Sequence, residues 1–199
     1  DRETMEVVNM VLAGKINKEL VTMLNHVGVK AAGLSGQDGG LLIAAKKKLS
    51  GGEDLGFVGE VERVNPELLH TLLVKGYIPV VATVGVGGEG EIYNINADTV
   101  AGELAAALQA EKLIILTDVE GIHEDPADSS TLISKLKIAK ALEMIEDGRI
   151  GSGMIPKVQA CIYALRHGVS RTHIIDGRRP HSLLLEVLTD KGIGSMVVE

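Results

Sequence analysis

Aromatic residues are scarce in this chain of 199 residues. It has no tryptophan, one phenylalanine and three tyrosines, so aromatic side chains make up only 2% of it. Proteins that bind single-stranded nucleic acid stack bases on such side chains, and every phosphate-backbone binder needs a surplus of Lys and Arg. The formal charge here is −7. We therefore expect no nucleic-acid partner, whereas a small anionic ligand needs only a few local positive groups.

Cysteine and long apolar runs are equally scarce. Cys161 is the only cysteine, so no disulfide can form within the chain and a reducing compartment is expected. No apolar run approaches the roughly 20 residues of a membrane span, and residues 1–6 lack the basic and apolar regions of a secretory signal. We therefore expect a cytoplasmic protein, or one of the plastid stroma if the source is a plant, with no membrane partner.

Apolar patterns alternate between strand-like and helix-like segments along the chain. Strands are predicted at residues 29–34, 41–45, 57–64, 78–84, 113–116, 172–176 and 195–198, and helices at 5–12, 16–24, 66–73, from about 97, and at 138–146, 155–167 and 182–188. Alternation of this kind is typical of an α/β fold with a mostly parallel central sheet sandwiched by helices. The glycine-rich turn between the first two strands predicts a hairpin.

Residues 85–90 read Gly-Val-Gly-Gly-Glu-Gly and match the G-x-G-x-x-G fingerprint of dinucleotide-binding folds. In those folds the glycines open a helix directly, so that the pyrophosphate meets the helix N-terminus. Here residues 91–96 alternate like extended chain, and the helix begins only near Ala97. We therefore reject a Rossmann oxidoreductase and interpret the glycines as a flexible loop over a substrate. A Walker-type phosphate loop is absent from the sequence.

Polar side chains flank a helix and a buried strand in the middle of the chain. Asn94 and Asp98 lie at the start of an Ala- and Leu-rich helix, where backbone N–H groups have no helical partner. The apolar run at residues 113–116 stops at Thr117 and Asp118, as a buried parallel strand does at its carboxyl end. Ligands of open α/β sheets bind at such ends.

A second polar segment is the glycine-punctuated loop at residues 148–157, which ends in the first turn of a helix with Lys157. Gly151 and Gly153 let backbone N–H groups approach a phosphate, and the lysine adds a point charge there. The alternative is an exposed lysine after an ordinary connection. Together, the two segments indicate phosphoryl transfer, and a carboxylate acceptor would need no general base because it is ionised at pH 7.

Four segments, at residues 33–39, 93–102, 116–122 and 153–158, resemble the acetylglutamate kinase branch of the amino acid kinase family. The resemblance covers essentially the whole chain. It implies a fold of the amino acid kinase and carbamate kinase type, and ATP-dependent phosphorylation of the side-chain carboxylate of N-acetyl-L-glutamate in arginine biosynthesis. Residues 1–92 would be the remainder of the lobe for acetylglutamate binding and dimerisation, and residues 93–199 the ATP-binding lobe with an effector segment.

The resemblance also implies roles for individual residues. Asn94 would bind acetylglutamate, Lys157 would steady the transferring phosphoryl group, and Asp98 would orient the lysines. The nucleotide site would be lined by Thr117, Asp118, Gly121, Ile122, Gly151, Gly153 and Met154. Mg²⁺ would arrive with the nucleotide, and the isolated histidines predict no further metal site.

The C-terminal segments 173–186 and 189–194 resemble the arginine-inhibited subgroup of these kinases. Glu186 can pair with a guanidinium, His173 can add a polar contact, and Gly192 permits close approach of a small ligand. The alternative is that Glu186 is an exposed helix residue and His173 a strand-edge residue. The resemblance further implies a homodimer through the first helix and, as a candidate partner, a PII-type signalling protein.

Two alternatives stay open at this point. The chain could be a sibling kinase acting on glutamate, aspartate or carbamate, or a ligand-sensing module without turnover. The family's first strand with its phosphate loop and lysine, a further glycine pair and a substrate-binding arginine would all lie upstream of Asp1, which suggests an N-terminally truncated chain without its first strands. We therefore expect the 199 residues alone to turn over negligibly, and a higher oligomer to need the missing part.

Overall fold

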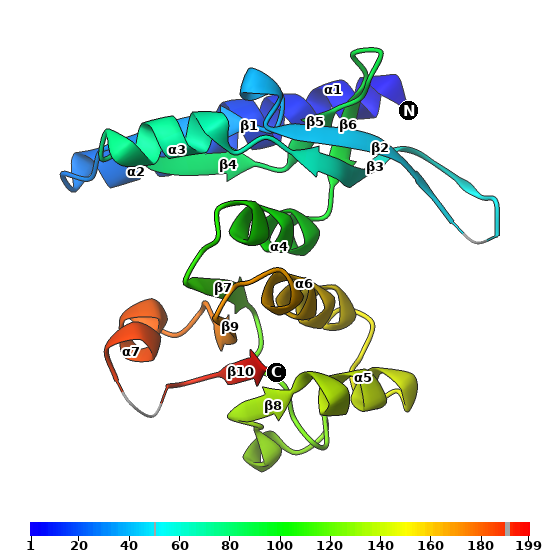
Figure 1. The fold of residues 1–199 in the computed structure, drawn as a ribbon, viewed down its shortest axis with the longest axis vertical. Coiled ribbons are helices and arrows are strands. Elements are labelled where there is room, and N and C mark those ends of the chain that lie inside the picture. Colours follow the sequence, from blue (N-terminus) through cyan, green and yellow to red (C-terminus); the bar gives the residue numbers. More distant parts are fainter. Residues whose placement is uncertain (50, 190–191) are drawn as a thin grey trace. The chain divides into compact units, whose positions relative to one another are not determined.

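The computed structural model describes residues 1–49, 51–189 and 192–199 (Figure 1). The chain forms two compact units, Asp1–Val100 and Ala101–Glu199, which are described separately below. Helix α4 (Ala97–Ala107) contributes residues to both units. Within the described ranges, no helix combines the length and the apolar character that crossing a membrane requires.

The first unit begins with a long helical segment that packs on a small parallel sheet. The segment comprises α1 (Arg2–Asn9), the π-helix η1 (Met10–Ile16) and α2 (Asn17–His26), and the sheet comprises β1 (Ala31–Ser35) and β4 (Ile78–Ala82), with α3 (Glu67–Val74) against β4. Asn17 is buried, and its Nδ2 donates to the carbonyls of Leu34 at 3.1 Å and Val80 at 2.7 Å. This one carboxamide therefore ties the helical segment to both strands.

A closed barrel forms the rest of the first unit. Its strands are β2 (Leu42–Lys48), β3 (Asp54–Val64), β6 (Ile92–Ile95) and β5 (Val84–Val86), in that order around the barrel, and the short 3-10 turn η2 (Asp38–Gly40) precedes them. Leu42, Val84 and Ile95 are almost fully buried. On β6, Tyr93 and Ile95 are buried while Asn94 is only partly so, because successive side chains of a strand point to opposite faces.

The second unit is a four-stranded sheet covered by helices. The strands β7 (Lys112–Thr117), β9 (Arg171–Asp176), β10 (Ser195–Val198) and β8 (Lys135–Lys137) lie in that order, with β7 parallel to β9, β8 parallel to β10, and β10 antiparallel to β9. Helix α6 (Ile155–Arg166) packs against β7, β9 and β10, α5 (Ile138–Glu146) against β8 and β10, and α7 (Ser182–Leu188) against β9 (Figure 1).

Helix α6 is the centre of this packing. Six of its residues are buried, including Val158, Cys161 and Ala164 with no exposed surface. Small residues let α4 approach it closely, since a Cβ on Gly102 would lie 2.9 Å from the carbonyl oxygen of Ala160. A side chain larger than hydrogen at Gly102 would therefore force the two helices apart.

The predicted α/β class is confirmed, with parallel strands flanked by helices, and the helices at 138–146 and 182–188 are found with the predicted bounds. The predicted hairpin of the first two strands is wrong, because β1 pairs with β4 and β2 with β3. The predicted strand 78–84 divides at Thr83 into β4 and β5. Periodicity reports which face is buried and carries no information on the partner strand, so the pairing had to come from the structure.

The glycines of residues 85–90 do not open a helix, which confirms the rejection of the dinucleotide fingerprint. Gly85 lies in β5, and the N–H of Gly87 donates to the carbonyl of Glu91 at 2.7 Å to close the turn into β6. Helix α4 begins at Ala97. The first two glycines of the pattern therefore belong to a strand and a strand-to-strand turn.

A polar contact joins α4 and α6 within the second unit. The hydroxyl of Tyr163 donates to Oε2 of Glu103 at 2.6 Å, and the Tyr163 ring stacks on His167 with centroids 4.0 Å apart. Burial of the hydroxyl, together with its hydrogen bond to Glu103, raises the pKa of Tyr163 to about 12. The neutral phenol is thus favoured by the fold.

We predict that the stability of the chain depends on Tyr163 at alkaline pH. The pKa of a tyrosine in an unfolded chain is about 10, and that of Tyr163 in the folded chain is about 12. Its contribution is therefore complete below pH 10 and lost as the pH rises to 12. Urea unfolding between pH 8 and 11.5 should show a free energy that falls less steeply in Tyr163→Phe, with Tyr77→Phe as control. Equal slopes for all three chains would contradict this.

Candidate functional site

The first predicted site segment lies where β6 leads into α4, in the first unit. Asn94 is on β6, paired in register with Val58 of β3 and Val84 of β5. Asn96 caps the helix, since its Oδ1 accepts from the backbone N–H of Thr99 at 3.0 Å. Asp98 lies in the first turn of α4. Asn94, Asn96 and Asp98 therefore lie on β6, at the cap of α4 and in the first turn of α4, respectively.

The carboxyl ends of β7 and β9 bring the next polar residues together. Thr117 is in register with Asp176, and the Thr117 hydroxyl donates to Oδ1 of Asp118 at 3.3 Å. Arg178 pairs with Asp176 at 2.9 Å, and its hydrogen bonds hold the pKa of that carboxyl below the usual range. As the sequence predicted, β7 ends at Thr117, with the exposed carboxylate of Asp118 directly after it.

A pocket of about 170 Å³ opens between two chain segments of the second unit. The first wall comprises residues 119–126 and the second wall residues 149–154; the lining residues are Val119, Gly121, Ile122, His123, Pro126, Arg149, Ile150, Gly151 and Met154. Four of the predicted nucleotide residues thus line the pocket: Gly121, Ile122, Gly151 and Met154. Thr117, Asp118 and Gly153 do not line this pocket. Apolar side chains predominate among its walls, which suits a flat, weakly polar group such as a nucleobase.

The glycines of the second wall have no packing role. A Cβ on Gly151 or Gly153 would meet no atom within 4 Å, and neither backbone has a positive φ. Both residues are exposed. The space beside them can therefore admit an external group close to the backbone, as phosphate binding requires. Lys157 follows in the first turn of α6, next to Pro156, which is well placed at a helix start.

The first wall is held by the C-terminal strand. The backbone N–H of Ile122 donates to Oγ of Ser195 at 2.8 Å, and the Ser195 hydroxyl donates to the carbonyl of Ile133 at 2.6 Å. A Cβ on Gly121 would lie 2.6 Å from the same Oγ, so this position leaves no room for a side chain. The glycine predicted for the nucleotide site is therefore needed for packing as well.

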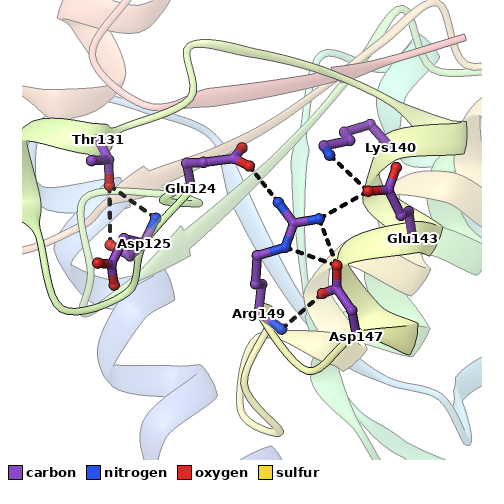
Figure 2. A network of polar contacts seen from close by, with 7 residues as sticks. All are labelled: Glu124, Asp125, Thr131, Lys140, Glu143, Asp147 and Arg149. Atoms are coloured by element: carbon purple, nitrogen blue, oxygen red, sulfur yellow. Dashed lines mark hydrogen bonds and ion pairs between the residues drawn. The ribbon is translucent and has the colours of Figure 1, made fainter.

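Arg149, which lines the pocket, is at the centre of a network of charged residues (Figure 2). The guanidinium of Arg149 contacts Glu124, lies 2.6 Å from Oδ2 of Asp147 and 3.0 Å from Oε1 of Glu143, and Lys140 pairs with Glu143 at 2.8 Å. The hydrogen bond from Arg149 lowers the pKa of Asp147, and that from Lys140 is the main cause that lowers the pKa of Glu143. These carboxylates are therefore ionised throughout the neutral range.

The three predicted effector residues lie together in the second unit. Nδ1 of His173, on β9, is 2.6 Å from Oε1 of Glu186, on α7, and Oε2 of Glu186 accepts from the backbone N–H of Ile193 at 2.7 Å. The side chains of His173 and Glu186 are 10% and 7% exposed. Gly192 has a φ of 59°, and a Cβ there would lie 3.0 Å from Oε2 of Glu186.

This arrangement excludes the plainer alternative for both residues. Glu186 is not an exposed helix residue, and His173 lies on β9, between β7 and β10, so it is not at the sheet edge. Nε2 of His173 is buried and has no hydrogen-bond partner among the residues that the structure describes. Asp190 and Lys191 of the predicted segment lie outside the described residues.

Sequence reasoning missed the ion pairs of Arg149. Its pairing with Asp147, two residues away, could have been suspected, but Glu124 is 25 residues distant and belongs to another loop. No local pattern signals such a contact. The sequence around His123 carries no site signal either, yet His123 lines the pocket, and its Nδ1 is buried without a partner in the described part of the chain.

Comparison with known proteins gives a consistent result. The sequence profile of the amino acid kinase family matches residues 1–176. An acetylglutamate kinase from Moorella thermoacetica is 60% identical over 205 aligned residues, which cover 100% of this chain and 69% of that protein.

Two solved structures of N-acetylglutamate synthase from Neisseria gonorrhoeae are also similar. The complex with coenzyme A and N-acetyl-glutamate has a TM-score of 0.88 at 26% identity and covers 100% of this chain and 44% of that one. The complex with coenzyme A and L-arginine has a TM-score of 0.72 at 28% identity, covering 85% and 38%. With a profile match over residues 1–176 and a relative 60% identical over the whole of this chain, the chain belongs to the amino acid kinase family.

Proposed function

We propose that this protein transfers the γ-phosphoryl group of ATP to the side-chain carboxylate of N-acetyl-L-glutamate. The observation that carries the proposal is the 60% identity to an acetylglutamate kinase over the whole chain. The pocket between residues 119–126 and 149–154 supports the proposal. Both segments are predicted nucleotide-binding segments, and residues of both line this one pocket. Residues 1–92, together with Asn94 and Asp98, would then serve the acceptor, and the other residues of 93–199 the nucleotide.

The nucleotide would be held by the second unit. Ile122, Ile150 and Met154 offer apolar surface to the base, and the open backbone at Gly151 and Gly153 admits the phosphates. Lys157, in the first turn of α6, adds positive charge where a helix N-terminus already favours anions. Mg²⁺ would enter with the nucleotide and neutralise part of the phosphate charge.

The acceptor would be held by the first unit, with the Asn94 amide as a hydrogen-bond donor and Asp98 as a charge that orients lysines. The acceptor carboxylate is ionised at neutral pH. One of its oxygens bonds to the γ-phosphorus as the bond from that phosphorus to the bridging oxygen of ADP breaks, so no proton has to move. The chemistry therefore needs positioning and charge neutralisation rather than a general base.

We predict that Lys157→Ala lowers the turnover number of the full-length protein by about 100-fold or more, the usual loss when one charge-stabilising donor is removed. Acyl phosphate formation is measured by trapping with hydroxylamine. Lys157→Arg should recover only part of the activity, because a planar guanidinium does not replace a point charge. Lys137→Ala, on β8, is the matched control. Turnover of Lys157→Ala within twofold of the unsubstituted protein would exclude this role.

The acceptor can be tested with the same assay. The alternative sibling kinases act on glutamate, aspartate or carbamate. Each of these acceptors should yield far less trapped product than N-acetyl-L-glutamate. A preference for one of them would replace the proposed acceptor and keep the family.

The ligand-sensing alternative is tested by calorimetry on the 199-residue chain. Binding of arginine without any binding of N-acetyl-L-glutamate would favour it.

We further propose that L-arginine is an inhibitory effector bound at His173, Glu186 and Gly192. The buried carboxylate of Glu186 can pair with a guanidinium, because its negative charge is removed from water. Gly192 beside it has a left-handed backbone and no side chain that would occupy the space of the ligand. The buried Nε2 of His173 offers an additional polar partner. The synthase from Neisseria gonorrhoeae that resembles this chain has been solved with L-arginine, which supports the choice of ligand.

We predict that Glu186→Gln weakens arginine binding by roughly 10- to 100-fold, since a hydrogen bond to a charged group contributes about 1.5–3 kcal/mol. Isothermal titration calorimetry measures the dissociation constant. Glu111→Gln, an exposed glutamate before β7, should bind arginine as the unsubstituted chain does. Arginine binding of unchanged strength in Glu186→Gln would rule out this cluster as the effector site.

A homodimer and a PII-type partner complete the proposed assembly. The long helical segment exposes several large apolar side chains, among them Val7 at 53%, Met10 at 63% and Met23 at 58%. Exposed apolar surface of this kind is typical of protein interfaces. The segment is therefore the proposed dimer contact, whereas the PII-type partner rests on the family resemblance alone.

A further inference from the structure

We propose that Arg149 is a positioning residue of the nucleotide pocket, whose ion pair with Glu124 fastens the second wall to the first and so sets the affinity for the nucleotide. The proposal rests on the proposed function, because it assumes that the pocket of residues 119–126 and 149–154 receives ATP. It adds a determinant of affinity that requires no contact between the Glu124 side chain and the nucleotide.

The position of the two residues carries the argument. Glu124 directly follows His123 on the first wall, and Arg149 directly precedes Ile150 on the second wall; His123 and Ile150 both line the pocket. The contact between Arg149 and Glu124 spans 25 residues of chain and crosses from one wall to the other (Figure 2). Any opening of the pocket at this edge has to break it.

In the part of the chain that the structure describes, the other hydrogen bonds of the two walls do not run from one wall to the other. On the first wall, the N–H of Glu124 donates to the carbonyl of Thr131 at 3.0 Å, and the N–H of Asp125 donates to the Thr131 hydroxyl at 3.1 Å. On the second wall, the N–H of Ile150 donates to the carbonyl of Met144 at 2.9 Å. These bonds fix each loop to its own surroundings, and Ile122 and Ile150 are buried in one apolar core, so the ion pair acts on the exposed edge of the two walls.

The three carboxylates around Arg149 have different tasks. Glu143 and Asp147 belong to the end of α5, on the same side as Arg149 in sequence, and hold the guanidinium at 3.0 and 2.6 Å. They aim the arginine. Glu124 comes from the opposite wall, so of the three contacts only this one joins the two walls. The guanidinium can serve all three because it offers five donors in a planar fork.

The expected contribution to folding stability is small. The side chains of Arg149 and Glu124 are 26% and 52% exposed, and ion pairs at such exposure stabilise a fold only slightly. The effect belongs to binding, because a pocket whose walls are already held in place loses less freedom when the ligand enters. A loss of roughly three- to tenfold in affinity is expected when the contact is removed.

For Glu124→Ala, simple electrostatics predicts the opposite change in ATP affinity. Removing Glu124 deletes a negative charge beside a site for a polyanion, so charge alone would tighten ATP binding. Loss of the wall-to-wall contact weakens it. Glu124→Ala therefore separates a positioning role from a mere charge effect, and it leaves Arg149 with its partners Glu143 and Asp147.

The test is a calorimetric titration of the 199-residue chain with ATP and Mg²⁺, with thermal unfolding to verify that each variant folds. We expect Glu124→Ala to bind three- to tenfold more weakly and Arg149→Ala at least as weakly. The double variant should be no worse than Arg149→Ala, since one contact is lost in each case. Lys140→Ala is the matched control, because it removes a cation of the same network that does not reach the first wall, and its affinity should change less than twofold.

Three results would decide against the proposal. Glu124→Ala that binds ATP as tightly as the unsubstituted chain, or more tightly, overturns it, as does an additive double variant. If the unsubstituted chain does not bind ATP at all, the nucleotide site itself fails, and that is seen before any variant is measured. In the full-length protein, Glu124→Ala should raise the KM for ATP more than it lowers kcat, whereas a general loss of structure would lower both the turnover and the melting temperature.

Discussion

The hydroxyl of Ser195 is the constraint on which the pocket depends. Buried in β10, it accepts from the N–H of Ile122 and donates to the carbonyl of Ile133, and so fixes both ends of the loop 122–133, which carries part of the first wall. Because β10 lies between β8 and β9, this loop is attached to the middle of the sheet rather than to its edge. Glu124, which meets Arg149, lies two residues beyond the anchored Ile122.

Much of the fold followed from the sequence, and the exceptions have physical causes. Long apolar patterns such as that of α6 report burial reliably, because a helix must present the same face over several turns. The three-residue strand β8 reads Lys-Leu-Lys and carries no recognisable period. The partner of β1 could not be inferred either, since β4 lies more than 40 residues further along the chain.

The candidate site divides in the same way. Gly151, Met154 and Ile122 could be named in advance because their segments match the family, and the pocket brings them together. The ion pair of Arg149 with Glu124 could not be named in advance, because the two residues are 25 positions apart, whereas Asp147 is only two positions from Arg149. For the effector cluster, the sequence supplied the residues, while the burial of the His173 and Glu186 side chains became apparent only from the packing of α7 on β9.

A single residue separates the two proposed ligand sites along the chain. Ile193 is bonded to Glu186, Ser195 is bonded to Ile122, and Gly194 lies between them. One methyl group at Gly194 would fall 2.2 Å from the carbonyl oxygen of Ile174, so the strand below leaves no space for any other residue. Substitutions on either side can change the effector cluster or the nucleotide loop, but position 194 has room only for glycine.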